Sequence, residues 1–115
     1  MAQLMNKTKA LTLCSEVETA KTLWKRTKGL LGRRHLDTHK VLWIEPCSSI
    51  HTYFMKFPID VAFVDKNLKV TRIEKQVNPW KLVFSTLRSH SVFEFSSGVL
   101  NPNNIDIGDQ LHVDS

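Results

Sequence analysis

The sequence predicts a single α+β domain, mainly β, in which an antiparallel, barrel-like sheet is crossed by one amphipathic helix. The chain has 115 residues and a mass of 13.2 kDa, which is too short to divide its apolar residues between two self-sufficient cores. Short runs rich in β-branched and aromatic residues dominate from Val41 onward, whereas one stretch nearer the N-terminus has helical spacing. We therefore expect one domain that spans residues 1–115.

The first two predicted elements are a strand and the helix. Residues Ala10–Cys14 alternate apolar and polar side chains, as a half-buried strand does. Ser15 and Glu18 then form the S-x-x-E pattern of a capping box, which predicts a helix that begins at Glu16 and ends near the two glycines that follow. The buried stripe of this helix would comprise Val17, Ala20, Leu23, Trp24 and Thr27.

The later strands would form a mainly antiparallel sheet. Asp65-Lys66-Asn67 is the clearest hairpin signal, because Asp and Asn tolerate the left-handed backbone of a tight turn. Asn78-Pro79 interrupts a long strand, and Asn101-Pro102-Asn103-Asn104 marks a loop or a single helical turn. The predicted strands are Val41–Glu45, Ile50–Met55, Ile59–Asp65, Leu68–Val77, Val92–Phe95 and Gln110–Val113.

The composition is typical of a soluble globular protein. Hydrophobic residues make up 42% of the chain and charged residues 23%, and no run approaches the roughly 18 apolar residues of a membrane span. The start of the chain lacks the apolar block of a signal peptide, so we expect a cytoplasmic protein, with export of a longer native form left open. Cys14 and Cys47 are too few for a disulfide scaffold, so free thiols are expected, with one bridge left open if their strands are neighbours. We expect a monomer without a cofactor.

Basic residues outnumber acidic ones and gather in one segment. Sixteen Lys and Arg against eleven Asp and Glu give a net charge of +5, which favours anionic partners through long-range attraction. No nucleic-acid-binding module is recognisable, so nucleic acid is not expected as the partner. One hypothesis is a surface that binds an acidic protein or a polyanion, and the alternative is an ordinary solvated face. The predicted basic patch comprises Lys25, Arg26, Lys28, Arg33 and Arg34.

The block Glu45–Asp65 carries a dense motif, E-P-C-S-S-I-H-T-Y-F-M-K-F-P-I-D-V-A-F-V-D. It resembles the domain of unknown function 192 family of bacterial and archaeal proteins, whose pattern is P-C-x-x-I-H-T-x-x-M, then a basic residue, then x-P-I-D-V-x-F-x-D. Further matches to the family's R-x-x-G-L-x-G-R, V-x-E-x-x-x-G and G-D-x-L are carried by Arg26, Gly29, Leu30, Gly32, Arg33, Val92, Glu94, Gly98, Gly108, Asp109 and Leu111.

This resemblance implies a compact, mostly β fold with a helix, and it supplies no settled activity. Two positions depart from the family pattern. Leu68 stands where a hairpin glycine is usual, and Ser96 stands where a proline is common. We expect Asn67 to carry the positive φ of that hairpin turn instead.

The same motif suggests a ligand pocket. Strand alternation mixes polar and apolar residues on both faces of residues 50–56, as in a strand that lines a cavity or an edge. Lys56 would supply a cation, Asp60 would orient it from an otherwise apolar face, and His51 would titrate near neutrality. The leading hypothesis is a module that binds a small anionic or sugar-like ligand through His51, Thr52, Met55, Lys56, Asp60 and Trp80.

Each of these residues also has a structural interpretation. Asp60 could cap the Phe57-Pro58 corner, and His51 could bond to the backbone. Trp80 could cover the end of the barrel rather than flank a ligand groove.

Cys47 raises two further hypotheses. Spaced C-x-x-x-H with His51, it could form the thiolate–imidazolium pair of a nucleophilic enzyme, although no third orienting group is evident and packing is the alternative. Four zinc ligands could also be counted, but their spacing fits no familiar zinc motif, so no metal is expected. They would be His35, His39, Cys47 and His51.

Overall fold

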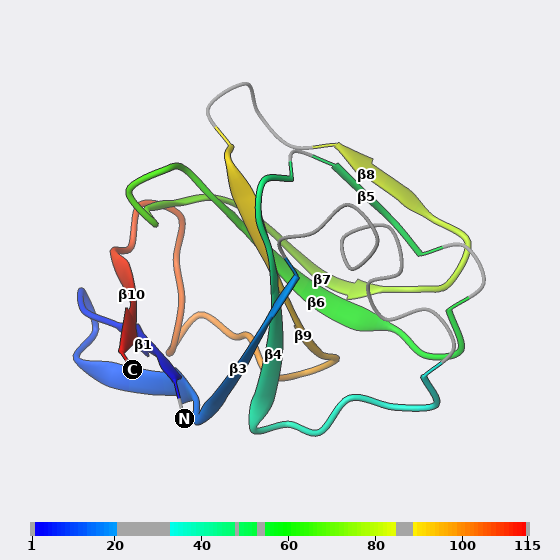
Figure 1. Ribbon diagram of the computed structural model, residues 1–115, viewed down its shortest axis with the longest axis horizontal. Coiled ribbons are helices and arrows are strands. Elements are labelled where there is room, and N and C mark those ends of the chain that lie inside the picture. The colour runs from blue at the N-terminus through cyan, green and yellow to red at the C-terminus, as the bar shows by residue number, and fades with distance from the viewer. Residues whose placement is uncertain (1, 21–32, 48, 53–54, 85–88, 115) are drawn as a thin grey trace.

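The described part of the protein is built of short strands in three hydrogen-bonded sheets (Figure 1). The structure is a computed structural model and describes residues 2–20, 33–47, 49–52, 55–84 and 89–114, with the side chain of His51 excepted. Its strands are β1 (Gln3–Asn6), β2 (Leu11–Cys14), β3 (Glu16–Ala20), β4 (Lys40–Ile44), β5 (Ser49–His51), β6 (Ile59–Val64), β7 (Val70–Val77), β8 (Leu82–Phe84), β9 (Ser91–Ser96) and β10 (Leu111–Asp114).

A five-stranded sheet forms the middle layer. Its strand order is β3-β4-β9-β6-β7, in which β3 and β4 are parallel and the other described pairs are antiparallel. Every residue of β6 is buried, as its nearly continuous apolar run I-D-V-A-F-V predicts. Because β6 and β9 pair from Ile59 with Ser96 to Val64 with Ser91, the P-I-D-V motif lies directly beside the V-x-E motif.

Two apolar clusters cover the two faces of this middle sheet. Side chains alternate along each strand, so β4, β6 and β9 contribute to both clusters. One cluster joins the three-stranded sheet β10-β1-β2 to the first face, for example through Leu4 and Phe93. The other joins the two-stranded sheet β5-β8 to the second face, for example through Ile50 and Phe63. The two smaller sheets therefore sandwich the middle layer.

The predicted helix from Glu16 is wrong over the residues that are described. Residues Glu16–Ala20 form β3, which pairs in parallel with Lys40–Ile44. The Ser15 hydroxyl donates to the carbonyl of His39 at 3.4 Å instead of capping a helix, and the Ser15 and Glu16 amides donate to that same carbonyl. Pairing with an inner strand outweighs the local capping pattern, and the β-branched residues of this segment suit a strand.

The rest of the predicted helix, residues 21–32, lies outside the described residues. The described strands also form no closed barrel, because the middle sheet ends at β3 and β7, and it is joined to the three-stranded sheet through the isolated bridge between Lys69 and Gln110. The mainly β class is confirmed, whereas the helix and the barrel-like closure are not. Within the described ranges there is no helix long and apolar enough to cross a bilayer.

Most of the predicted strands are confirmed with small shifts at their ends. They correspond to β2, β4, β6, β7, β9 and β10. Of the run Ile50–Met55, Ile50 and His51 lie in β5, Thr52 and Met55 do not, and residues 53–54 lie outside the described residues. Sequence patterns missed β1, β3 and β8, which are short strands of three to five residues.

The hairpin between β6 and β7 turns where it was predicted, but a different residue takes the unusual backbone. Asp65 Oδ1 accepts hydrogen bonds from the amides of Asn67 at 2.8 Å and Lys69 at 3.0 Å. The positive φ of 64° falls on Leu68, so the prediction for Asn67 is wrong. Leu68 packs its half-buried side chain against a core cluster, which offsets part of the cost of a left-handed backbone.

Candidate functional site

The carboxylate of Asp60 is a structural hub of the P-I-D-V motif. Asp60 is fully buried on β6. Its Oδ1 accepts a hydrogen bond from the Gln76 amide at 2.8 Å, and its Oδ2 accepts from the amides of Gly98 at 3.0 Å and Leu100 at 2.9 Å. Gln76 and Gly98 have positive φ values of 53° and 91°, so the carboxylate fastens two backbone segments of unusual conformation.

The structure does not bring the predicted pocket residues together. The amides that Asp60 binds come from β7 and from the segment after β9, not from the Phe57-Pro58 corner. Lys56 is exposed and forms no ion pair within the described chain, and Met55 is buried in a core cluster. The side chain of His51 lies outside the described residues. A ligand-binding role for these residues stays a prediction.

Thr52 organises the turn that carries Trp80. The buried Thr52 hydroxyl donates to the Asn78 carbonyl at 2.7 Å and accepts from the Lys81 amide at 2.8 Å. The Thr52 backbone adds two bonds, from its amide to the Lys81 carbonyl and from the Trp80 amide to its own carbonyl. Trp80 itself is 60% exposed, and both interpretations of this residue, a cover for the end of the sheet and a flank of a ligand groove, stay predictions.

A shallow hollow of about 310 Å³ opens between the segment after β4 and the segment before β9. It is lined by Pro46, Cys47, Ser89 and His90. The Cys47 amide donates to the His90 carbonyl at 2.8 Å and joins the two walls, and the Cys47 thiol donates to the Ser49 carbonyl at 2.8 Å. Residues with thiol, hydroxyl and imidazole side chains thus line the hollow, and the Ser89 hydroxyl lies 2.7 Å from Thr71 Oγ1.

A buried oxygen lies next to this hollow in the sequence. Glu45 precedes Pro46, and its Oε2 atom is buried without a hydrogen-bond partner among the described residues. Buried polar atoms are nearly always hydrogen-bonded, so an exception calls for an explanation. Glu45 is not among the residues that line the hollow, so this oxygen is not evidence for a ligand there.

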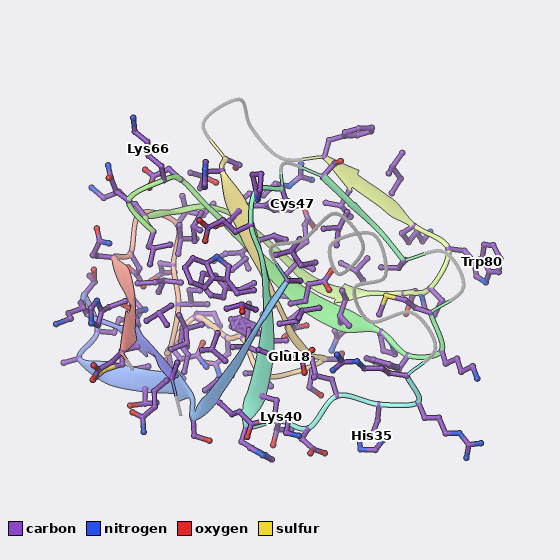
Figure 2. The ribbon with its side chains drawn as sticks, in the orientation of Figure 1. Glu18, His35, Lys40, Cys47, Lys66 and Trp80 are labelled. Atoms are coloured by element: carbon purple, nitrogen blue, oxygen red, sulfur yellow. The ribbon has the colours of Figure 1, made fainter. Side chains whose placement is uncertain are left out.

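The two cysteines differ in environment. Neither forms a disulfide, as expected. Cys14 lies on β2 of the three-stranded sheet and is buried in a core cluster, and burial raises the pKa of its thiol to about 12. Cys47, labelled in Figure 2, is half-buried, and it lines the hollow. Only Cys47 is therefore placed to react.

The predicted basic patch is described only at its end. Arg33 is ion-paired with Glu18 of β3, and Arg34 is exposed. His35, once counted toward a zinc site, lies 3.2 Å from the Asp37 carboxylate, and the described residues contain no cluster of three potential metal ligands. The members outside the described residues are Lys25, Arg26 and Lys28.

Glu94 stands in the centre of the middle sheet within a row of carboxylates. Directly paired residues of neighbouring strands share a face. Glu94 pairs with Leu42 of β4 and Val61 of β6, and these two pair in turn with Glu18 and Glu74. Three glutamates therefore lie in one row across the sheet.

The two outer carboxylates of this row are neutralised and the central one is not. Glu18 pairs with Arg33, and Glu74 Oε1 lies 2.7 Å from Arg72 Nη2, whereas no ion pair joins Glu94 within the described chain. Burial raises the pKa of Glu94 to about 7, and the Arg33 charge limits the rise. Glu94 therefore titrates near neutrality, which makes it a second candidate for function.

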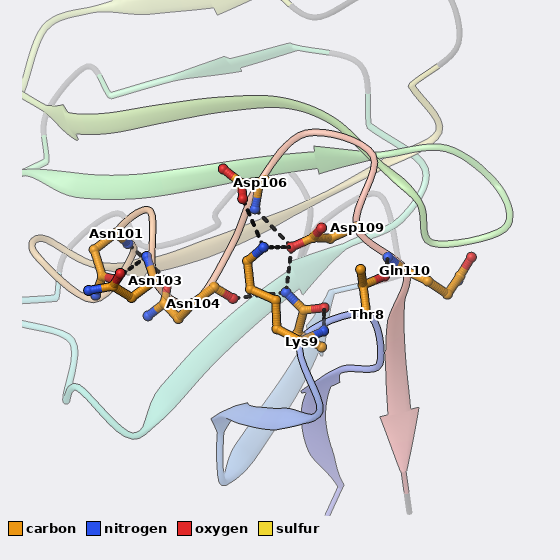
Figure 3. A network of polar contacts seen from close by, with 9 residues as sticks. Thr8, Lys9, Asn101, Asn103, Asn104, Asp106, Asp109 and Gln110 are labelled. Carbon is orange, nitrogen blue, oxygen red and sulfur yellow. Dashed lines mark hydrogen bonds and ion pairs between the residues drawn. The ribbon is translucent and has the colours of Figure 1, made fainter.

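The G-D-x-L segment belongs to a network of polar contacts that joins the β1–β2 turn to the segment before β10 (Figure 3). Asp109 Oδ2 accepts hydrogen bonds from Asn6 Nδ2 at 2.8 Å and from the Asp106 amide at 2.9 Å. Lys9 Nζ lies 2.8 Å from Asp106 Oδ2 and 3.3 Å from Asp109 Oδ2. Burial opposes ionisation of Asp109, but the bonds from Asn6, the Asp106 amide and Lys9 outweigh it and lower the Asp109 pKa. The network is structural.

The described residues define a small, mainly β protein of three sheets with a shallow hollow lined by Pro46, Cys47, Ser89 and His90. The chain belongs to the domain of unknown function 192 family, described as uncharacterized ACR, whose model matches residues 4–113. A UPF0127 protein of Thermococcus sibiricus is 31% identical over 113 residues, which cover 94% of this chain and 72% of that protein. A UPF0127 protein of Pyrococcus horikoshii is 27% identical over 113 residues and is covered to 96%.

Two solved structures share the fold. A protein of unknown function from Novosphingobium aromaticivorans aligns with a TM-score of 0.81 at 19% identity, covering 96% of this chain and 82% of that one. A Sinorhizobium meliloti protein, provisionally described as a transcription regulator, aligns with a TM-score of 0.78 at 18% identity, covering 97% of this chain and 91% of that one. At such identities the likeness shows the fold alone.

Sequence reasoning missed three residues of these sites as functional candidates. Glu94 interrupts the apolar run of β9, and a charge between two phenylalanines is a signal that could have found it. Ser89 and His90 carry no comparable signal, because their place in the hollow depends on the pairing of segments far apart in the chain.

Proposed function

We propose that the protein binds a small polar compound, anionic or sugar-like, in the hollow lined by Pro46, Cys47, Ser89 and His90. The observation that carries the proposal is the hollow itself, since small-molecule sites are concave and hold a few convergent polar groups. The His90 imidazole can donate or accept hydrogen bonds, whereas the Ser89 hydroxyl already shares a hydrogen bond with Thr71 Oγ1 at 2.7 Å. The proposal keeps the predicted class of ligand but moves the pocket away from Asp60, whose oxygens already bind three amides.

Protection of Cys47 from alkylation tests this proposal. Iodoacetamide should modify Cys47 and spare Cys14, whose thiol is buried and has a pKa of about 12. Phosphate, citrate and glucose serve as probes of the anionic and sugar-like classes. A probe that occupies the hollow should slow the alkylation of Cys47 by about tenfold at a concentration ten times its Kd.

A matched pair of variants localises the effect. His90→Ala should abolish the protection, whereas His35→Ala, which removes an exposed histidine elsewhere, should preserve it. Failure of every probe to protect Cys47, or equal protection in His90→Ala, would count against the hollow as the binding site.

The same reaction separates binding from catalysis. Fast alkylation of Cys47 well below pH 8 would show a stabilised thiolate and favour a nucleophilic enzyme. The basic-surface hypothesis predicts salt-sensitive retention on heparin instead.

A further inference from the structure

Exposed apolar side chains gather at one end of the molecule. The described chain exposes four large hydrophobic residues, and three of them lie at alternate positions of one segment: Trp80 at 60%, Leu82 at 51% and Phe84 at 62%. We call these three residues the apolar strip. Figure 2 shows Trp80 standing clear of the ribbon at one end, far from Lys66 at the other. Single exposed apolar residues are ordinary, but a row of three this large is not.

The pairing of β5 with β8 explains why the strip points outward. Ile50 pairs with Val83, and both pack inward against the core cluster. Because side chains alternate along a strand, Leu82 and Phe84 must point away from that cluster. The core already uses the inner face of this ribbon, so packing does not account for apolar residues on its outer face.

The strip is held in a defined position. Five hydrogen bonds link Thr52 to the turn at residues 78–81, and the Arg72 guanidinium donates to the Phe84 carbonyl. Trp80 has a positive φ of 69°, a strained conformation for a bulky residue. The exposed position of the Trp80 side chain is therefore accompanied by backbone strain.

The two segments that carry the strip and its partner strand are basic, and the nearby Glu74 is ion-paired with Arg72, whose guanidinium donates to the Phe84 carbonyl. Segments 49–58 and 75–84 together contain Lys56, Lys75 and Lys81 and no Asp or Glu. The amides of Met55 and Trp80 donate to the same Thr52 carbonyl, so the lysines that follow them, Lys56 and Lys81, leave the backbone close together.

These three lysines form no ion pair within the described residues, which is also true of Lys7, Lys66 and Lys69. All three lysines beside the strip are exposed. The ion pairs of the described residues use other cations instead: Lys9, Arg33, His35, Lys40 and Arg72.

We propose that the apolar strip and its lysines dock the protein on an anionic lipid surface. Tryptophan and other apolar side chains insert at the level of lipid headgroups, while lysines bind the negative charge around them. A second copy of the chain fits less well, because it would bring two sets of lysines together. Three side chains also expose far less than the roughly 800 Å² that each partner buries in a standard protein interface. Aliphatic Leu82 in mid-strip argues against stacked nucleic-acid bases.

Vesicle sedimentation tests the proposal on the intact protein. Vesicles of phosphatidylcholine with about one-third phosphatidylglycerol should bind the protein at least about tenfold more strongly than phosphatidylcholine alone, and added salt should weaken the binding. The double variant Trp80→Ser/Phe84→Ser should lose about tenfold or more of this binding, since it removes most of the inserted apolar surface. Lys81→Glu should lose several-fold.

Two matched controls keep the test decisive. Ile107→Ser removes the fourth exposed apolar side chain, which is 66% exposed, and Lys66→Glu reverses an exposed lysine at the other end. Both should bind like the wild type, and thermal melts should show that all variants remain folded. Equal binding to both vesicle types, no binding, or wild-type binding by the double variant would overturn the proposal. The proposal would also be overturned if the protein bound a single-stranded oligonucleotide more strongly than the anionic vesicles and the double variant lost that binding.

Discussion

At the scale of single residues, Asp60 shows how a correct inference about burial can lead to the wrong partner. A carboxylate in an apolar run had to be buried and satisfied, and it is both. The sequence suggested side chains close to it, such as Lys56. Its actual partners are amides 16, 38 and 40 residues away, and backbone amides leave no trace in a sequence.

Replacing Asp60 with Asn tests its structural role. The Asn side chain has one acceptor oxygen and an amino group that would face backbone N–H donors, so Asp60→Asn should lower the free energy of unfolding by about 3 kcal/mol. Urea unfolding measures this loss. Asp114→Asn, at an exposed position of β10, should stay within about 0.5 kcal/mol of the wild type. If Asp60→Asn were neutral, the three amide bonds would not be what fixes this region.

At the scale of elements, residues 16–20 show why local signals mislead. S-x-x-E favours a helix in an isolated chain, but here the segment forms a strand beside β4. Its partner lies more than 20 residues further along, so no local window contains the deciding interaction. The long, buried strands β6 and β9 were predictable because their own apolar runs suffice.

Where β7 pairs irregularly with β6, glycine substitutions at two adjacent residues should change the stability of the protein in opposite directions. Gln76 has an exposed side chain and a φ of 53°, so Gln76→Gly should relieve backbone strain and stabilise the protein by about 0.5 kcal/mol. Lys75 is equally exposed but has no positive φ, so Lys75→Gly should destabilise it by about 1 kcal/mol. Thermal and urea unfolding of both variants would show the contrast. Similar losses in the two would mean that Gln76 is not strained.

At the scale of the whole molecule, the sequence predicts the class and most strands but not how the sheets are assembled. Hydrophobic alternation identifies buried faces, while the strand order depends on contacts between distant segments. The hollow is an example, because the Cys47 amide reaches the His90 carbonyl across more than 40 residues. Neither the Pro46-Cys47 segment nor the Ser89-His90 segment predicts a binding site on its own.

The whole molecule should also have a stability optimum on the acid side of neutrality. The folded pKa of Glu94, about 7, lies above its ordinary value of 4.5, so its contribution to stability is full below pH 4.5 and is lost as the pH rises to about 7. The folded pKa of Asp109 lies below its ordinary value of 3.8, so its contribution is present above pH 3.8 and is lost as the pH falls further. From these two groups, the free energy of unfolding should peak between about pH 4 and 5.

Two substitutions separate the contributions of Glu94 and Asp109 to the pH dependence of the free energy of unfolding. Glu94→Gln cannot ionise, so it should exceed the wild type in stability by about 3 kcal/mol at pH 8 and match it near pH 4. Asp109→Asn should be less stable than the wild type at pH 6, and the gap should narrow below pH 3.8. Urea unfolding across this pH range measures both contributions. If the free energy of unfolding of Glu94→Gln falls between pH 5 and 7 as steeply as that of the wild type, another group titrates in this range. The Glu94 carboxyl would then not be the source of the pH dependence.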